Sequence, residues 1–235
     1  MIPCPRRHPL RAALPAAALA VLLLSGCASL LPGAREEAPA VLHPQVSRST
    51  GTVWLQPRHA REPLPLTGPL LLEPGDRLET GPDGKVEVLL PGAAVRAYGG
   101  SRFQVLYAFE GRRAGASEVR VEEGEVLVRR LGSEPLPVQT EALRVEVGPL
   151  ATVLVGSRGA AHHAACYEGR AEARNSRVRG QTVVWIAKGQ RLTLDDAATV
   201  AYLQDAKLPA EWSRWETPSA LTAGIVPPPT ATERR

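Results

Sequence analysis

The stretch VRVEEGEVLVRR, residues 119–130, decides the fold class of this 235-residue chain. Valine occupies every second position on both sides of Gly124, while charged residues and one leucine fill the positions between. A period of two places alternate side chains on opposite faces of a β-strand. We therefore expect two strands, at 119–122 and 126–129, joined by a turn at 123–125, because glycine adopts positive φ without steric cost.

The same alternation extends outward from this stretch over residues 51–194. Further strands are expected at 86–90, 143–147, 183–187 and 192–194. Turn sequences rich in Gly, Pro and acidic residues separate them: Pro74-Gly75-Asp76, Pro82-Asp83-Gly84, Pro91-Gly92, Gly99-Gly100, Glu168-Gly169-Arg170 and Lys188-Gly189-Gln190. Many short antiparallel strands with frequent glycine turns predict an all-β domain, built as a sandwich or a solenoid-like roll.

The composition agrees with a packed β domain. Hydrophobic residues make up 44% of the chain and aromatic residues only 4%, so the core must consist of Val, Leu and Ala. Three cysteines are too few for a disulfide-rich scaffold. The formal charge of +4, taken alone, suggests a nucleic-acid or anionic-surface partner.

The N-terminus resembles a bacterial lipoprotein signal. Three arginines precede an uncharged stretch at 12–24, whose 13 residues suit a secretory signal. A bilayer-spanning helix needs about 20 apolar residues. Leu24-Ser25-Gly26-Cys27 then matches the lipobox at all four positions. The resemblance implies that the Cys27 thiol takes a diacylglycerol, that the chain is cut before it, and that the new amino group is acylated; two or more acyl chains anchor a protein durably. The alternative is an ordinary signal peptide that contains a cysteine.

The signal changes how charge, cysteines and location are interpreted. Removal of residues 1–26 lowers the formal charge from +4 to +1, so no nucleic-acid partner is expected. Cys166 remains as the free thiol, and no disulfide is expected. Ala28, in place of Asp after the cysteine, favours the outer membrane over the inner membrane by the usual sorting convention. We expect a periplasm-facing protein held on the membrane by the lipid on Cys27.

The rest of the chain divides at changes of pattern. The expected parts are a signal peptide at 1–26, a lipidated cysteine and flexible tether at 27–50, the β domain at 51–194, a short helical segment at 195–216 and a disordered tail at 217–235. Asp195-Asp196 can cap a helical run at 197–206 that carries Val200 and Leu203 on one side.

Two tryptophans near the C-terminus are candidate partner contacts. Pro209 can open a second helical turn, which places Trp212 and Trp215 on one face. Tryptophan is enriched at binding hot spots. The alternative, which we favour, is that this segment covers an open edge of the β domain.

Three segments of the β region recur in a characteristic order. They are 68–86, with Gly75-Asp76 and Thr80-Gly81; 119–126, with the Glu-Gly pair; and 143–157, which ends in Val155-Gly156-Ser157. In this order they resemble the FecR domain, an all-β periplasmic module of bacterial iron-uptake regulators and of other envelope proteins. The resemblance covers about residues 51–194. It departs from the family after Gly156, where the expected aromatic and β-branched residues are missing.

The FecR resemblance implies a domain type and not the iron-signalling task. Regulators of that family also carry a cytoplasmic anti-sigma region and a membrane span before this domain, and we find neither here. A chain anchored by Cys27 would lie outside the cytoplasm and could not hold a sigma factor.

No enzyme motif or metal motif is convincing. On a strand, His162 and Cys166 would lie about 13 Å apart at roughly 3.3 Å per residue, and His163 would point to the other face. We therefore expect no metal site and no cofactor. Ser157 lacks the spacing of a nucleophile elbow, and no strand-to-helix turn follows it. We expect Glu122-Glu123 to be solvated rather than an acid–base pair.

The sequence thus predicts a non-catalytic lipoprotein whose FecR-like domain binds a protein in the cell envelope. Exposed strand edges suit recognition by strand addition. A structural lipoprotein associated with polysaccharide or peptidoglycan is the alternative, and a degenerate enzyme is a third, weaker option. No small-molecule substrate is expected.

Overall fold

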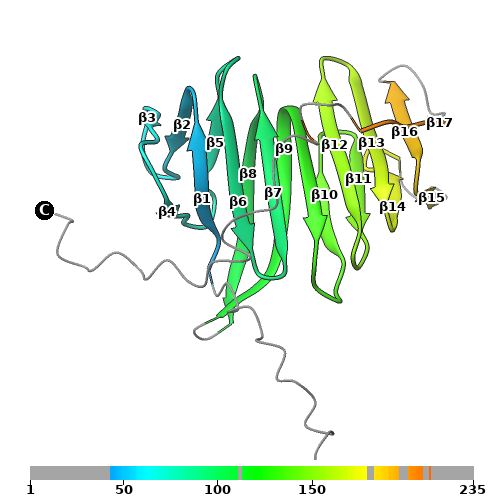
Figure 1. The fold of residues 1–235 in the computed structure, drawn as a ribbon, viewed down its shortest axis with the longest axis horizontal. Coiled ribbons are helices and arrows are strands. Elements are labelled where there is room, and N and C mark those ends of the chain that lie inside the picture. Colours follow the sequence, from blue (N-terminus) through cyan, green and yellow to red (C-terminus); the bar gives the residue numbers. More distant parts are fainter. Residues whose placement is uncertain (1–42, 111–112, 179–182, 196–200, 209–211, 213–235) are drawn as a thin grey trace, which may run out of the picture. The chain divides into compact units, whose positions relative to one another are not determined.

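The computed structural model describes residues 43–110, 113–178, 183–195, 201–208 and 212, and this part of the chain is almost entirely β (Figure 1). The chain divides into two compact units, Met1–Glu37 and Ala38–Arg235, of which the first lies outside the described residues. In the described ranges, no helix has the length and apolar character needed to cross a membrane. The expected all-β fold class is confirmed.

The strands form two sheets that share one long strand, β9 (Arg113–Arg130). Sheet A contains, in spatial order, β4 (Leu70–Leu71), β1 (Gln45–Thr50), β6 (Lys85–Leu90), β7 (Ala93–Tyr98), the C-terminal half of β9, β12 (Thr152–Arg158), β13 (Ala161–Glu168), β16 (Gln190–Asp195) and β17 (Ala201–Asp205). Sheet B contains β3 (Leu64–Pro65), β2 (Val53–Gln56), β5 (Arg77–Thr80), β8 (Arg102–Glu110), the N-terminal half of β9, β10 (Leu136–Gln139), β11 (Leu143–Val147), β14 (Arg170–Asn175) and β15 (Val184–Ala187).

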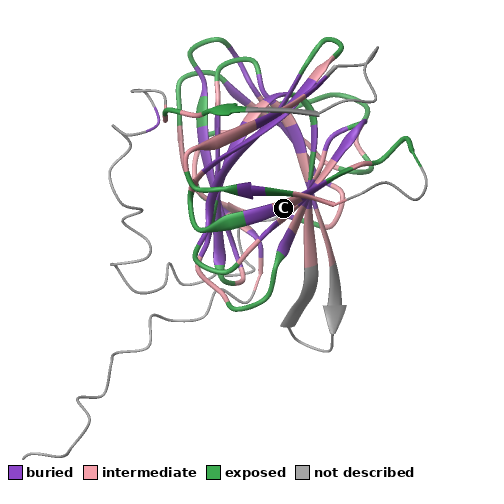
Figure 2. Cartoon of the chain, turned by 90° about the vertical axis from the view of Figure 1, so that its right-hand side faces the viewer, coloured by how far each residue is buried: buried purple, intermediate pink, exposed green. Residues whose placement is uncertain are grey.

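The two sheets enclose the main core, as the view along the row of strands shows (Figure 2). Every described strand pair is antiparallel except β9 with β10. The fully buried positions between the sheets are mostly Val, Leu and Ala, and Phe103 is the single buried aromatic residue of this cluster in the described ranges. The scarcity of aromatic residues therefore reflects a core filled by small and branched aliphatic side chains.

Gly124 does not end a strand, so the turn predicted at 123–125 is wrong. Strand β9 runs through Gly124, which has a φ of 78°, and passes there from sheet B to sheet A. A Cβ at this position would lie 2.6 Å from the Cα of Ser101. The Ser101 hydroxyl donates to the Glu125 carbonyl at 2.9 Å and accepts from the Glu125 amide at 3.1 Å. Glycine is needed here for a close approach of two strands, not for a hairpin.

The other predicted strands and turns are confirmed. Strands occupy the expected regions as β6, β11, β15 and β16, and turns or bends lie at the six remaining Gly-rich sequences. The segment after Gly156, which lacks the residues typical of a strand, nevertheless forms β13 between β12 and β16. Its alanines and histidines are accepted because both neighbouring strands satisfy its backbone groups.

The β domain begins earlier than expected. Residues 45–50, placed in the flexible tether at 27–50, form β1, which pairs with β6 and with β4. Val46 is only 1% exposed and belongs to the main core. A single buried valine among serines, an arginine and a threonine gives too weak an alternation to be recognised in the sequence.

The domain also ends later than expected. The helical run predicted at 197–206 is wrong for residues 201–205, which form β17 and extend sheet A beyond β16. In this register Leu203 lies opposite Leu192. The open hydrogen-bonding edge of β16 outweighs the local tendency toward a helix. Of the second predicted turn, the structure describes Trp212, which is helical, whereas Trp215 and the tail at 217–235 lie outside the described residues.

Candidate functional site: the outer face of sheet A

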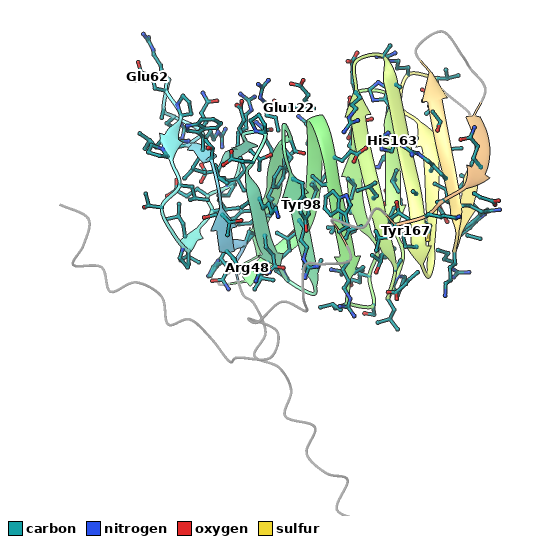
Figure 3. The ribbon with its side chains drawn as sticks, turned by 45° about the horizontal axis from the view of Figure 1, so that its top comes forward. Arg48, Glu62, Tyr98, Glu122, His163 and Tyr167 are labelled. Atoms are coloured by element: carbon teal, nitrogen blue, oxygen red, sulfur yellow. The ribbon has the colours of Figure 1, made fainter. Side chains whose placement is uncertain are left out.

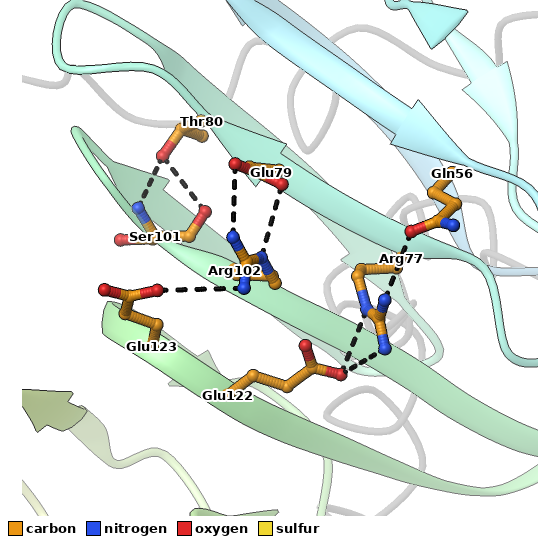
Figure 4. A network of polar contacts seen from close by, with 8 residues as sticks. All are labelled: Gln56, Arg77, Glu79, Thr80, Ser101, Arg102, Glu122 and Glu123. Carbon is orange, nitrogen blue, oxygen red and sulfur yellow. Dashed lines mark hydrogen bonds and ion pairs between the residues drawn. The ribbon is translucent and has the colours of Figure 1, made fainter. Parts of the chain in front are cut away.

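The outer face of sheet B is a ladder of ion pairs (Figure 4). The Arg77 guanidinium contacts the Glu122 carboxylate at 2.8 Å, and Arg102 contacts Glu79 at 3.2 Å and Glu123 at 3.8 Å. These side chains are roughly one quarter to two thirds exposed. Exposed pairs of this kind contribute little to stability, and this face is solvated. Glu122 and Glu123 are thus paired with arginines on a strand, and not with each other.

The outer face of sheet A has a different character, because it carries a band of buried apolar side chains. We define the apolar band as Leu127 of β9, Leu154 of β12 and Ala165 of β13, which are 5%, 2% and 1% exposed. Their chain neighbours on both sides belong to the main core, so alternation turns these three side chains away from the core. An apolar sheet face this well buried must be covered by something other than the second sheet.

The cover is Trp212. It packs on the apolar band, is 3% exposed, and meets the Tyr98 ring edge-on with ring centroids 4.1 Å apart. Ala206 and Leu208 are partly buried against the same band. Tyr98, His163 and Tyr167 lie along this face (Figure 3). Trp212 therefore covers the middle of a sheet face rather than an edge, and its side chain is not open to a partner in this structure.

Two cavities adjoin Trp212, and its side chain lines both. The first has a volume of about 490 Å³, and its polar lining includes Arg96, Arg129, Glu168 and Lys188. The second has a volume of about 300 Å³, and its polar lining includes Asp83, Lys85, Glu125 and Arg158. Tyr167 contributes an aromatic wall to the first cavity, and Tyr98 to the second.

A largely buried acid–imidazole pair lies at the second cavity, with the His163 side chain 5% exposed and the Glu125 side chain 19% exposed. Nε2 of His163 is 3.1 Å from Oε1 of Glu125. The hydrogen bond from His163 lowers the pKa of Glu125, with nearby Arg158 and Arg191 acting in the same direction and burial opposing it. Gly156 lies opposite His163, and a Cβ there would be 2.5 Å from the His163 ring. Glycine at position 156 therefore makes room for the imidazole.

A second buried pair lies closer to the first cavity. Oε2 of Glu87 on β6 is 2.8 Å from Nε of Arg96 on β7, and the side chains are 2% and 10% exposed. The Ser47 hydroxyl donates to the other Glu87 oxygen at 2.8 Å. Arg96 also lines the first cavity. This pair holds the charged Arg96 guanidinium beside the apolar band.

His162 and Cys166 lie on the opposite side of β13 from His163. Ala164 and Cys166 belong to the main core, and strand alternation places His162 on the same side. Cys166 is a free thiol whose Sγ donates to the Glu168 carbonyl at 3.2 Å, and burial raises its pKa to about 11. In the ranges the structure describes, no three potential metal ligands come together. The predicted strand geometry of His162, His163 and Cys166 is confirmed.

Sequence reasoning missed the apolar band, although a signal for it exists. Val-Leu-Val occurs at 126–128 and again at 153–155. A run of consecutive apolar residues within a strand indicates burial on both faces, whereas strict alternation indicates burial on one. The two leucines at the centres of these runs are the floor beneath Trp212. The Glu125–His163 and Glu87–Arg96 pairs have no comparable local signal.

Ser157, weighed as a nucleophile in the sequence, lies within β12 and is 6% exposed. The chain continues from β12 into a hairpin with β13, so no helix follows the serine. Cys27 and the lipobox, Leu24 to Gly26, lie outside the described residues.

Comparisons with known proteins give a limited result. No protein-family model matches the sequence, and no curated protein matches it. Two crystal structures of a proposed anti-sigma factor from Parabacteroides distasonis are similar, with 16% and 15% sequence identity and TM-scores of 0.45 and 0.46. Each match covers 55% of this chain and 59% of the other. The chain thus spans less than two thirds of that protein, and a similarity of this size assigns no function.

Proposed function

We propose that this chain is a lipid-anchored protein of the bacterial envelope whose β domain binds a protein partner without catalysing a reaction. The observation that carries the proposal is the apolar band with Trp212 on the outer face of sheet A. Apolar patches on a protein surface mark interaction sites, and the described cover of this one consists of Trp212 with Ala206 and Leu208. The outer face of sheet B carries the exposed ion pairs of Arg77 and Arg102 instead.

The lipobox supports the envelope location. Leu24-Ser25-Gly26-Cys27 follows a basic and then an apolar segment, in the order that lipoprotein processing requires. Acylation of Cys27 would hold the β domain on the periplasmic side of the outer membrane. The ordered FecR-like motifs support the same compartment, since that domain type serves in the periplasm.

The alternative, a lipoprotein associated with polysaccharide or peptidoglycan, has one observation in its favour. The second cavity combines the rings of Tyr98 and Trp212 with two carboxylates and two cations. Hydroxyl-rich ligands are bound by such mixed polar and aromatic linings. The cavity is small, however, and the Trp212 ring is almost fully buried, so a protein partner on the larger apolar surface remains the proposal.

Site-specific photo-crosslinking in intact cells tests this proposal. A photoreactive residue replaces Lys188, at the rim of the first cavity, and in a matched control replaces Arg120 on the solvated face of sheet B. We expect a discrete protein adduct from position 188 and none from position 120. Equal adducts from both positions would contradict a specific site on sheet A. Co-sedimentation with murein and no protein adduct would support the alternative.

A further inference from the structure

The two cavities meet at Trp212, whose side chain lines both and packs on the apolar band. Leu127 of the band also lines the first cavity. We refer to the two cavities together with the band as the groove.

The occupant of the groove belongs to the same chain but is held by few described contacts. After β17, residues 206–208 turn back over sheet A (Figure 1), and Ala206 and Leu208 pack on the band. The Ala206 amide donates to the Gly189 carbonyl at 2.7 Å, and residues 206–208 belong to no strand. Apart from this hydrogen bond, the described contacts of Ala206, Leu208 and Trp212 with sheet A are side-chain packing, which a similar side chain from another molecule can replace.

The charges around the first cavity favour an acidic ligand. Exposed Arg129 and Lys188 lie at its rim beside one exposed carboxylate, that of Glu168. In the second cavity two cations and two carboxylates balance. In the sequence, the acidic residue Glu211 directly precedes Trp212.

We propose that this groove docks a segment of a partner protein that presents an aromatic side chain next to acidic residues, and that Ala206, Leu208 and Trp212 occupy the groove until the partner displaces them. That the ligand is a protein rests on the proposed function above. The groove and its intramolecular occupant do not depend on it. The chain would thus carry its own competitor for the binding site.

A labelled peptide provides the test. A fluorescent peptide with the sequence of residues 204–216 is titrated into the full chain, into Trp212→Ala and into Trp185→Ala, a control that removes an exposed tryptophan from sheet B. We expect the peptide to bind Trp212→Ala at least tenfold more tightly than the full chain or the control. Added salt should weaken binding, because it screens the cations at the rim.

Two further variants examine the groove itself. In a Trp212→Ala background, Leu154→Arg places a charge on the floor of the groove and should abolish peptide binding. A peptide in which alanine replaces the tryptophan at position 212 should not bind either. Trp212→Phe, which keeps a smaller ring in place, should give intermediate affinity and serves as the test if Trp212→Ala does not fold, as judged by circular dichroism.

The outcomes separate this proposal from the proposed function. Equal affinity of the peptide for the full chain and for folded Trp212 variants would overturn the self-occupied groove, even if cells yield a protein adduct at position 188. Tighter peptide binding without any adduct would support the groove and count against the proposed protein partner. Tighter binding together with a severalfold stronger adduct in Trp212→Ala would support both.

Discussion

Glu87 carries a buried carboxylate that contacts both a charged and a neutral side chain. Its carboxylate and the Arg96 guanidinium are both almost fully buried, and Ser47 completes the acceptor's contacts. Removing the carboxylate takes a buried, charged contact away from Arg96, and breaking a buried ion pair in this way costs about 3–5 kcal/mol. We expect Glu87→Ala to lower the free energy of unfolding by this amount in urea titrations monitored by circular dichroism.

The control for this prediction is Glu79→Ala on sheet B. Glu79 and Arg102 are 40% and 39% exposed, so solvent screens their attraction. Loss of an exposed pair costs less than about 1 kcal/mol. Similar losses in the two variants would show that the pair on sheet A is not effectively buried.

Glu125 is expected to make the stability of the domain fall as the pH is lowered. Its pKa is lowered in the folded state, chiefly by the hydrogen bond from His163, so the contact contributes stability above the ordinary carboxyl pKa of 4.5. That contribution is lost as the pH falls through the lowered folded-state pKa. We expect Glu125→Gln to flatten the decrease in melting temperature as the pH falls below the ordinary carboxyl pKa, relative to the unmodified chain.

Glu62, in an exposed loop, provides the comparison for this pH series. Glu62→Gln should leave the acid decrease in melting temperature unchanged. A decrease of equal steepness in Glu125→Gln would assign the acid sensitivity to other carboxylates.

At the scale of the element, β9 is the strand on which both sheets depend. Gly124 combines a φ of 78° with a close approach to Ser101, so alanine there is strained and also lacks space. Gly189 has a φ of 81°, and a Cβ added there would meet no atom within 4 Å beyond its chain neighbours, so this position isolates the backbone effect. We expect Gly189→Ala to cost about 1–2 kcal/mol. Gly124→Ala should cost about 1–3 kcal/mol more because of overpacking, as measured by chemical unfolding.

Equal costs for the two glycine variants would mean that the Ser101 contact relaxes without penalty. In that case the passage of β9 between the sheets would depend on the backbone conformation alone. A crystal structure of Gly124→Ala would then show Ser101 displaced and the hydrogen bonds to Glu125 retained.

The sequence predicts the strands in which apolar and polar residues alternate strongly. It does not predict strands that form only because a neighbouring strand offers an edge to pair with. The valine rows at 86–90 and 143–147 identify β6 and β11 because each shows the period directly. Strands β1 and β17 have weaker patterns and form because β6 and β16 offer open edges. The Glu-Gly-Glu sequence at 123–125 is compatible with a turn or a bulge, and only the proximity of Ser101 distinguishes them.

At the scale of the whole molecule, the candidate site is less predictable than the fold. The floor residues Leu127 and Leu154 are detectable as centres of apolar runs. Their cover, Trp212, lies 58 positions after Leu154, and no local pattern joins them. Glu125 and His163 likewise meet only because β9, β12 and β13 are adjacent in sheet A. Long-range pairing therefore determines the site, whereas short-range periodicity determines most of the strands.

The proposed lipid anchor predicts that the location of the molecule depends on one side chain, that of Cys27. If Cys27 carries the lipid, Cys27→Ala removes the acyl chains and blocks processing at that site. In cell fractionation, we expect the protein to leave the membrane fraction and to appear in the soluble periplasmic fraction or as the uncleaved precursor. Cys166→Ala, which alters a buried thiol of the core, should stay membrane-bound. Retention of Cys27→Ala on membranes after an alkaline carbonate wash, which strips peripherally bound proteins, would contradict the lipoprotein assignment, because an anchor other than this lipid would then hold the domain in the membrane.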